Sequence, residues 1–111
     1  MDVAGNAEDS GSMQLGGNIE LIGFSDIDKA QLVVVKKMVG NYAKKFSEMV
    51  KNFEKLSIAM KEIHNVEKPG SYEINAKIMA EGRPINSSVT DRNLFFGIDK
   101  ALKVVEEMIK K

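Results

Sequence analysis

Residues 71–89, SYEINAKIMAEGRPINSSV, decide the fold class of this 111-residue chain. Apolar and polar residues alternate from Ser71 to Ala80, which predicts a strand with one buried face. The inward positions of that strand are Tyr72, Ile74, Ala76 and Ile78. A turn at residues 81–84 then leads into a short strand whose inward positions are Ile85, Ser87 and Val89. The two segments therefore predict a β-hairpin.

Two earlier segments show the same alternation. Residues 53–65 place Leu56, Ile58 and Met60 on one face, and the turn at residues 67–70 joins them to the hairpin. Because the connections are short, we expect these three strands to form an antiparallel meander. A further strand is predicted over residues 18–24.

Two segments have the three-to-four spacing of helices. The first helix is predicted to start at Ser25, with Asp28 in a capping-box position. Its apolar stripe comprises Ile27, Val34, Val35, Met38, Tyr42 and Phe46. The last helix, capped by Thr90 or Asp91, has the cleanest stripe: Leu94, Ile98, Ala101, Leu102, Val105, Met108 and Ile109.

The predicted order is β-α-β-β-β-α. We expect an α+β two-layer sandwich, in which two helices cover one face of a four-stranded sheet. Residues 1–17 are rich in small and acidic residues and lack hydrophobic periodicity, so they are predicted to be a disordered acidic tail. Residues 18–111 form the single predicted domain.

Composition excludes several classes of protein. The absence of cysteine excludes disulfides, zinc–thiolate sites, iron–sulfur clusters and a cysteine nucleophile, and it fits a reducing cytoplasm. No apolar run approaches the ~20 residues that span a bilayer, and no secretory signal opens the chain. We therefore expect a cytoplasmic protein that does not contact a membrane.

Catalytic signals are nearly absent. His64 is the only histidine, and an exposed position at the end of a strand is favoured over a metal ligand or general base with Glu62 and Glu67. Glu106 and Glu107 are adjacent on a helix, so they point ~100° apart and cannot face each other. No phosphate-binding loop or nucleophile motif occurs. We expect no enzyme activity, no cofactor and no small-molecule substrate.

Charge is unevenly distributed, although the net charge is zero. Residues 29–51 contain six lysines and one acid, Glu48, and such a local excess attracts phosphates. The predicted open sheet face has no aromatic residue for base stacking, and the chain lacks a GXXG loop, so a nucleic acid would contact the helices. The candidate RNA-binding residues are Lys29, Lys36, Lys37, Lys44 and Lys45 on the first helix and Lys100, Lys103 and Lys110 on the last, with Lys111 beside them.

The sequence resembles the ribosome hibernation-promoting factor family, also called ribosome-associated inhibitors or sigma-54 modulation proteins. That family opens on a strand of the type NIEITG, and residues 18–23 read NIELIG. Its first helix ends in a KKL…KYF pattern, which KKM at 36–38 and KKF at 44–46 match. Its last helix reads like DMYAAID-x-A, and residues 93–101 read NLFFGIDKA.

The resemblance covers residues 18–111 and implies a double-stranded-RNA-binding-domain-like order, α-β-β-β-α, with one strand in front. It also implies binding to small-subunit ribosomal RNA under stress, with modulation of translation. The residues carried over are Lys36, Lys37, Lys44, Lys45, Lys103 and Lys110. Val104 and Glu107 depart from the family, whose members often have basic residues there. Without a long C-terminal extension, the chain resembles the short form.

A second hypothesis is a protein-interaction module. Ile22, Ile63 and Met79 are expected on the open sheet face, where they would favour a protein partner or a homodimer without RNA binding.

Overall fold

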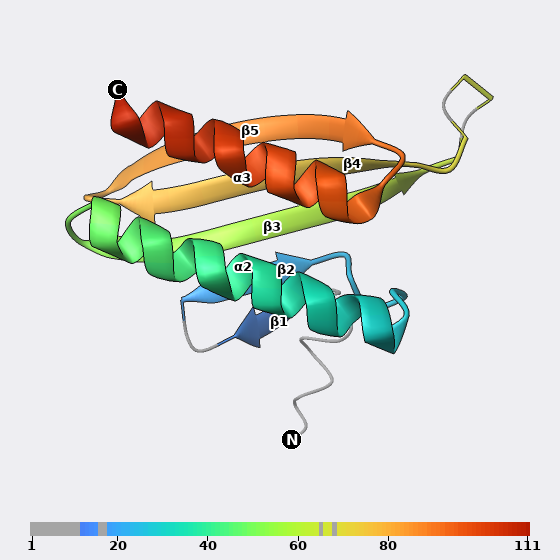
Figure 1. Cartoon of the computed structure of the whole chain (residues 1–111), viewed down its shortest axis with the longest axis horizontal. Coiled ribbons are helices and arrows are strands. Elements are labelled where there is room, and N and C mark those ends of the chain that lie inside the picture. Colours follow the sequence, from blue (N-terminus) through green and yellow to red (C-terminus); the bar gives the residue numbers. More distant parts are fainter. Residues whose placement is uncertain (1–11, 16–17, 65, 68) are drawn as a thin grey trace.

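The fold is an α+β sandwich of two helices and a five-stranded mixed sheet (Figure 1). The computed structural model describes residues 12–15, 18–64, 66–67 and 69–111. The elements are β1 (Ser12–Leu15), β2 (Ile19–Ile22), α2 (Lys29–Met49), β3 (Phe53–Ile63), β4 (Ser71–Ala80), β5 (Arg83–Asp91) and α3 (Leu94–Lys110).

The sheet has the spatial order β1-β2-β3-β4-β5. The strands β3, β4 and β5 form the predicted antiparallel meander, and the turn between β4 and β5 has positive φ at Glu81 and Gly82. Strand β2 pairs with β3 in parallel, because α2 carries the chain back across the sheet between them. Both helices lie on the same face, as predicted (Figure 1).

The prediction of four strands was wrong by one. Residues 12–15, which were predicted to belong to the tail, form β1 and pair antiparallel with β2. Met13 and Leu15 point toward the helices and pack against the core. The missed signal was the alternation of Ser12, Met13, Gln14 and Leu15, which is too short to stand out between glycines. The rest of the predicted tail, residues 1–11 and 16–17, lies outside the described residues.

Both predicted helix starts were displaced. The N-cap of α2 is Asp28 and not Ser25, because the Asp28 carboxylate accepts hydrogen bonds from the backbone N–H groups of Ala30 and Gln31. The N-cap of α3 is Asn93, whose side chain accepts from the N–H of Phe96. Asp91 lies in β5 and instead accepts from the N–H of Asn93.

The core fills the space between the helices and the sheet. From the sheet it takes Leu21, Leu56, Ile58, Ile74 and Ile78, and from the helices it takes Val35, Val39, Phe46, Ile98, Leu102 and Val105, all fully buried. The predicted stripe of α2 was partly wrong, since Val34 is 44% exposed while Val39 and Ala43 are buried. Met108 at the end of α3 is 45% exposed, although it was predicted to be inward.

Candidate nucleic-acid interface

The lysines of α2 are exposed, as the spacing predicted, and they divide between two flanks of the helix. At ~100° per residue, Lys29, Lys36, Lys37 and Lys44 lie on one side of the buried stripe. Tyr42 and Lys45 lie on the other side, where they contact α3. We call the first four residues the outer lysine flank.

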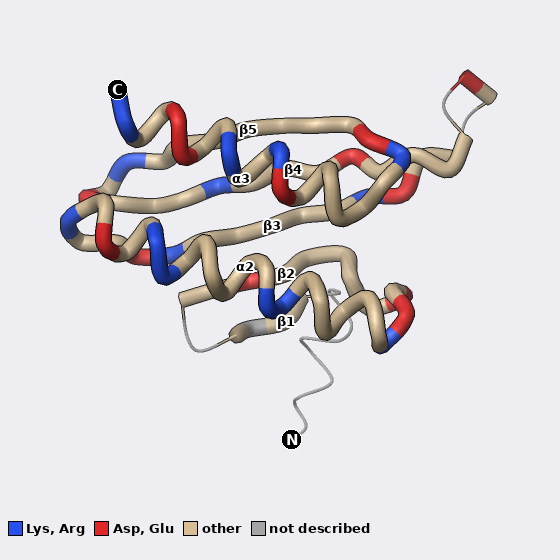
Figure 2. Tube along the Cα trace, viewed as in Figure 1, with Lys and Arg blue, Asp and Glu red and all other residues tan. Residues whose placement is uncertain are grey.

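The outer lysine flank is not neutralised by acids within the described residues. None of its four ammonium groups forms an ion pair with a described carboxylate at 4.0 Å or less. The sequence from Lys29 to Lys45 contains no acidic residue, and Figure 2 shows this part of α2 as basic segments with no acidic one between them. Among the described residues these four lysines therefore have no ion-pair partner, and α2 carries an excess of positive charge.

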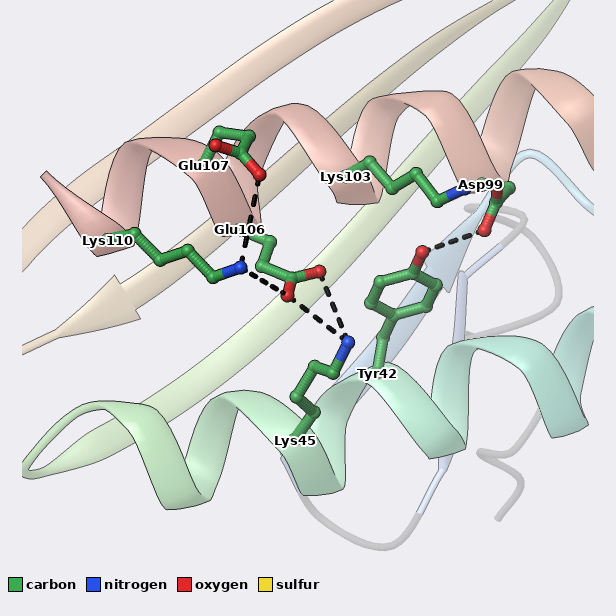
Figure 3. A network of polar contacts seen from close by, with 7 residues as sticks. All are labelled: Tyr42, Lys45, Asp99, Lys103, Glu106, Glu107 and Lys110. Atoms are coloured by element: carbon green, nitrogen blue, oxygen red, sulfur yellow. Dashed lines mark hydrogen bonds and ion pairs between the residues drawn. The ribbon is translucent and has the colours of Figure 1, made fainter.

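The other predicted RNA-binding lysines are paired with carboxylates. Lys45 lies 3.2 Å from Glu106, Lys103 lies 3.1 Å from Asp99, and Lys110 lies 3.4 Å from Glu106 (Figure 3). On the far side of α3, Lys100 lies 3.6 Å from Asp91. The expected basic ridge is thus concentrated on α2, because acids of α3 and β5 offset most of the charge that α3 carries.

A polar seam joins α2 to α3 (Figure 3). The Tyr42 hydroxyl donates a 2.7 Å hydrogen bond to Oδ1 of Asp99, and the ammonium of Lys45 lies 5.6 Å from the centre of the Tyr42 ring. Burial and the neighbouring Asp99 carboxylate raise the pKa of Tyr42 well above its usual range. The phenol therefore remains a hydrogen-bond donor at every physiological pH.

The carboxylates of the seam are held in their charged form. The hydrogen bond from Tyr42 lowers the pKa of Asp99, with a further contribution from Lys103. The ammonium of Lys45 lowers the pKa of Glu106, with a further contribution from Lys110. These acids serve the contact between the helices, a role that was not predicted from the sequence. Asp99 and Glu106 are seven residues apart on one face of α3, a spacing that could have indicated a partner helix.

The open face of the sheet is mostly polar. A shallow hollow of about 560 Å³ lies there, with Ile22, Ala59 and Met79 among its apolar lining residues and Asn75 and Lys77 among its polar ones. At the edge of the hollow, Lys55 forms a 2.8 Å ion pair with Glu20, which also accepts a hydrogen bond from Ser12. The Lys55 ammonium lowers the pKa of Glu20.

A second hollow, of about 780 Å³, opens where the C-terminal ends of α2 and α3 meet the β4–β5 turn. Its lining includes the basic residues Lys51, Arg83 and Lys111 and the apolar residues Met49 and Ile109. Neither hollow collects the convergent titratable groups of a catalytic site.

The described residues hold neither a cluster of metal ligands nor a membrane-spanning helix. Across residues 12–15, 18–64, 66–67 and 69–111, no three histidine, cysteine, aspartate or glutamate side chains gather as metal ligands, and His64 is exposed. Neither described helix has the length and apolar character of a membrane span.

No protein-family model matches the chain, and no curated protein sequence matches it.

Proposed function

We propose that this chain binds RNA through the outer lysine flank of α2. The observation that carries the proposal is the absence of described carboxylate partners around Lys29, Lys36, Lys37 and Lys44. At ~1.5 Å per residue, these lysines extend over about 22 Å of the helix axis, which is long enough to contact several successive phosphates. Lysines read phosphate positions and shape and not base sequence, so the target is structured RNA.

The proposed RNA is that of the small ribosomal subunit, and the proposed role is modulation of translation in the cytoplasm during stress. Two observations support this choice. The order α2-β3-β4-β5-α3 is that of a double-stranded-RNA-binding domain, and the motifs at residues 18–23, 36–46 and 93–101 resemble the ribosome hibernation-promoting factor family. Within the proposal, the outer lysine flank makes the phosphate contacts. Lys45 instead joins α2 to Glu106 of α3, and Lys103 and Lys110 pair with acids of α3 itself.

Sucrose-gradient sedimentation with purified small subunits tests the proposal. The test variant is Lys37→Glu with Lys44→Glu, and the matched control is Lys61→Glu with Lys77→Glu, which places the same charge change on exposed positions of the sheet. We expect the test variant to remain at the top of the gradient, while the control and the parent co-sediment with subunits at low salt. Co-sedimentation of the test variant to the same extent as the control would refute the proposal.

The salt dependence of binding measures how many phosphates the lysines neutralise. Each phosphate that a variant no longer neutralises is expected to reduce the slope of log K against log salt by about one. Neutral substitutions at Lys36, Lys37 and Lys44 should therefore reduce the slope by about three, whereas Lys100→Gln should change it by less than about one. If the variant of Lys36, Lys37 and Lys44 changed the slope no more than Lys100→Gln does, the RNA would bind to another surface of the protein.

A further inference from the structure

The strand β5 forms an open edge of the sheet. It pairs with β4 on one side, and no described strand pairs with its other side. Its register with β4 is regular from Arg83 to Asp91, without a bulge. Residues 85–90, INSSVT, contain neither a charge nor a proline. Monomeric proteins usually block such edges with lysines, bulges or prolines. Pro84 is the second residue of β5, and residues 85–90 carry no such block, so this part of the edge can pair with another strand.

The adjacent flank of α3 carries two exposed apolar side chains beside Lys100, which pairs with Asp91. Val104 is 41% exposed and Met108 is 45% exposed, and both lie on the side of α3 that faces away from α2. The hydroxyl of Ser87 donates a 2.7 Å hydrogen bond to the carbonyl of Ala101, which fixes α3 above β5. Two exposed apolar side chains therefore stand beside an open strand edge.

We propose that β5 pairs antiparallel with β5 of a second copy of the chain. The sheet then runs continuously through both copies, and each α3 packs against the partner's α3 through Val104 and Met108. A two-fold axis perpendicular to the sheet generates this interface, which uses the same surface of both copies. It keeps all helices on one side of the joined sheet.

The sequence of β5 selects one register. Residues directly opposite one another in an antiparallel pair point to the same face of the sheet. A two-fold axis between two residues would pair a residue of one face with a residue of the other, so the axis must pass through a residue. With Ser87 on the axis, Arg83 lies opposite the partner's Asp91, and Ile85 lies opposite the partner's Val89. Opposite charges and β-branched pairs both stabilise cross-strand contacts. With the axis at Ser88, Ile85 would instead face the partner's Asp91.

The dimer leaves the proposed RNA-binding surface accessible. The outer lysine flank lies on the side of α2 remote from α3, so a partner at the β5 edge does not cover it. The dimer and the RNA interface are consequently separable by mutation.

Light scattering coupled to size exclusion tests the dimer on the full chain. The parent is expected to have about twice its monomer mass of 12.3 kDa at high micromolar concentration. Val104→Lys should raise the dimer dissociation constant about tenfold or more, as expected for a charge placed in an apolar contact. The matched control is Val33→Lys on α2, where the valine is 65% exposed and distant from β5, and this variant should dimerise like the parent.

Cysteine pairing tests the register, because the chain has no cysteine of its own. Asn86 faces the partner's Ser88, so a mixture of Asn86→Cys and Ser88→Cys should form a disulfide-linked dimer faster than either variant alone. A parent that stays monomeric overturns the proposal, as does a Val104→Lys variant that dimerises as well as the control. Preferential linkage within one single variant overturns the register.

Discussion

The hydroxyl of Tyr42 on α2 donates a 2.7 Å hydrogen bond to Oδ1 of Asp99 on α3, across 57 positions of sequence. Beside it, Lys45 of α2 contacts both carboxylate oxygens of Glu106 on α3, at 3.3 and 3.2 Å (Figure 3). Together these contacts join two helices whose apolar stripes mainly face the sheet. Two acids of α3 are thereby used to align the helix pair.

Removal of the Tyr42 hydroxyl should destabilise the fold. We expect Tyr42→Phe to lower the free energy of unfolding by about 1–2 kcal/mol, because the deleted hydrogen bond ends on a charged acceptor. Urea unfolding measures the change. A double-mutant cycle with Asp99→Asn should give a coupling energy above ~0.5 kcal/mol. If the changes in unfolding free energy of the two single variants added up to that of the double variant, the contact would contribute nothing to stability.

Acid should weaken the seam between the helices. The pKa of Glu106 lies below its ordinary value of 4.5 in the folded state because of the Lys45 ammonium. An acid whose pKa is lower in the folded state than in the unfolded state stabilises the fold at pH values above its unfolded-state pKa. This stabilisation is lost as the pH falls through the folded-state pKa. We expect Tm to fall below pH ~4.5 in the parent. The Tm of Glu106→Gln should be lower than that of the parent at pH 7, and the two Tm values should converge in acid.

Glu107→Gln is the matched control for this experiment. The Glu107 side chain is 70% exposed and lies 4.0 Å from Lys110 of the same helix, so it does not join α2 to α3. Its Tm curve should parallel that of the parent at every pH. If Glu106→Gln and Glu107→Gln gave the same curve, the seam would not be the source of the acid sensitivity.

The meander and both helices were predictable because their patterns are long and local. β4 occupies Ser71–Ala80, as the alternation indicated, and β5 follows after a two-residue turn. The helix caps were less predictable, since several residues near each start have side chains that can act as an N-cap. Ser25 and Asp28 are both good caps, but the chain forms a turn after Phe24, closed by a hydrogen bond from the Ile27 N–H to the Phe24 carbonyl, and the helix begins after Asp28.

The charge partners of the lysines could not be predicted from periodicity alone. A helical wheel shows that Lys45 is exposed, but Glu106 is 61 positions away, and only the packing of α2 against α3 brings them together. For this reason eight lysines were predicted together as RNA-binding residues. The structure distinguishes the four of the outer lysine flank from four that have described carboxylate partners.

The strand β1 should contribute to stability although it is short. Met13 and Leu15 are half-buried and pack against the core beside β2. Alanine at each position removes part of an apolar side chain from that interface, so the unfolding free energy of each variant should fall by about 1 kcal/mol. Val33→Ala, at a 65% exposed position, should change it by less than ~0.5 kcal/mol. Equal effects at all three positions would show that β1 does not dock in solution.

The two glycines within the helices should respond oppositely to alanine. A Cβ at Gly40 of α2 meets no atom within 4 Å, so Gly40→Ala should stabilise the protein by about 0.5–1 kcal/mol through helix propensity. A Cβ at Gly97 of α3 would overlap the Ile74 side chain and lie 3.3 Å from Cβ of Asp91. The resulting overpacking costs about 1–3 kcal/mol, which exceeds the gain in helix propensity.

Urea unfolding of Gly40→Ala and Gly97→Ala measures both effects on one scale. Because the chemical change is identical, the difference between the variants isolates the packing of α3 on β4 from the intrinsic preference of the helix. A destabilised Gly40→Ala would mean that a neighbour occupies the space beside α2. A stabilised Gly97→Ala would mean that Ile74 adopts another rotamer without cost, since the clash is with the end of its flexible side chain.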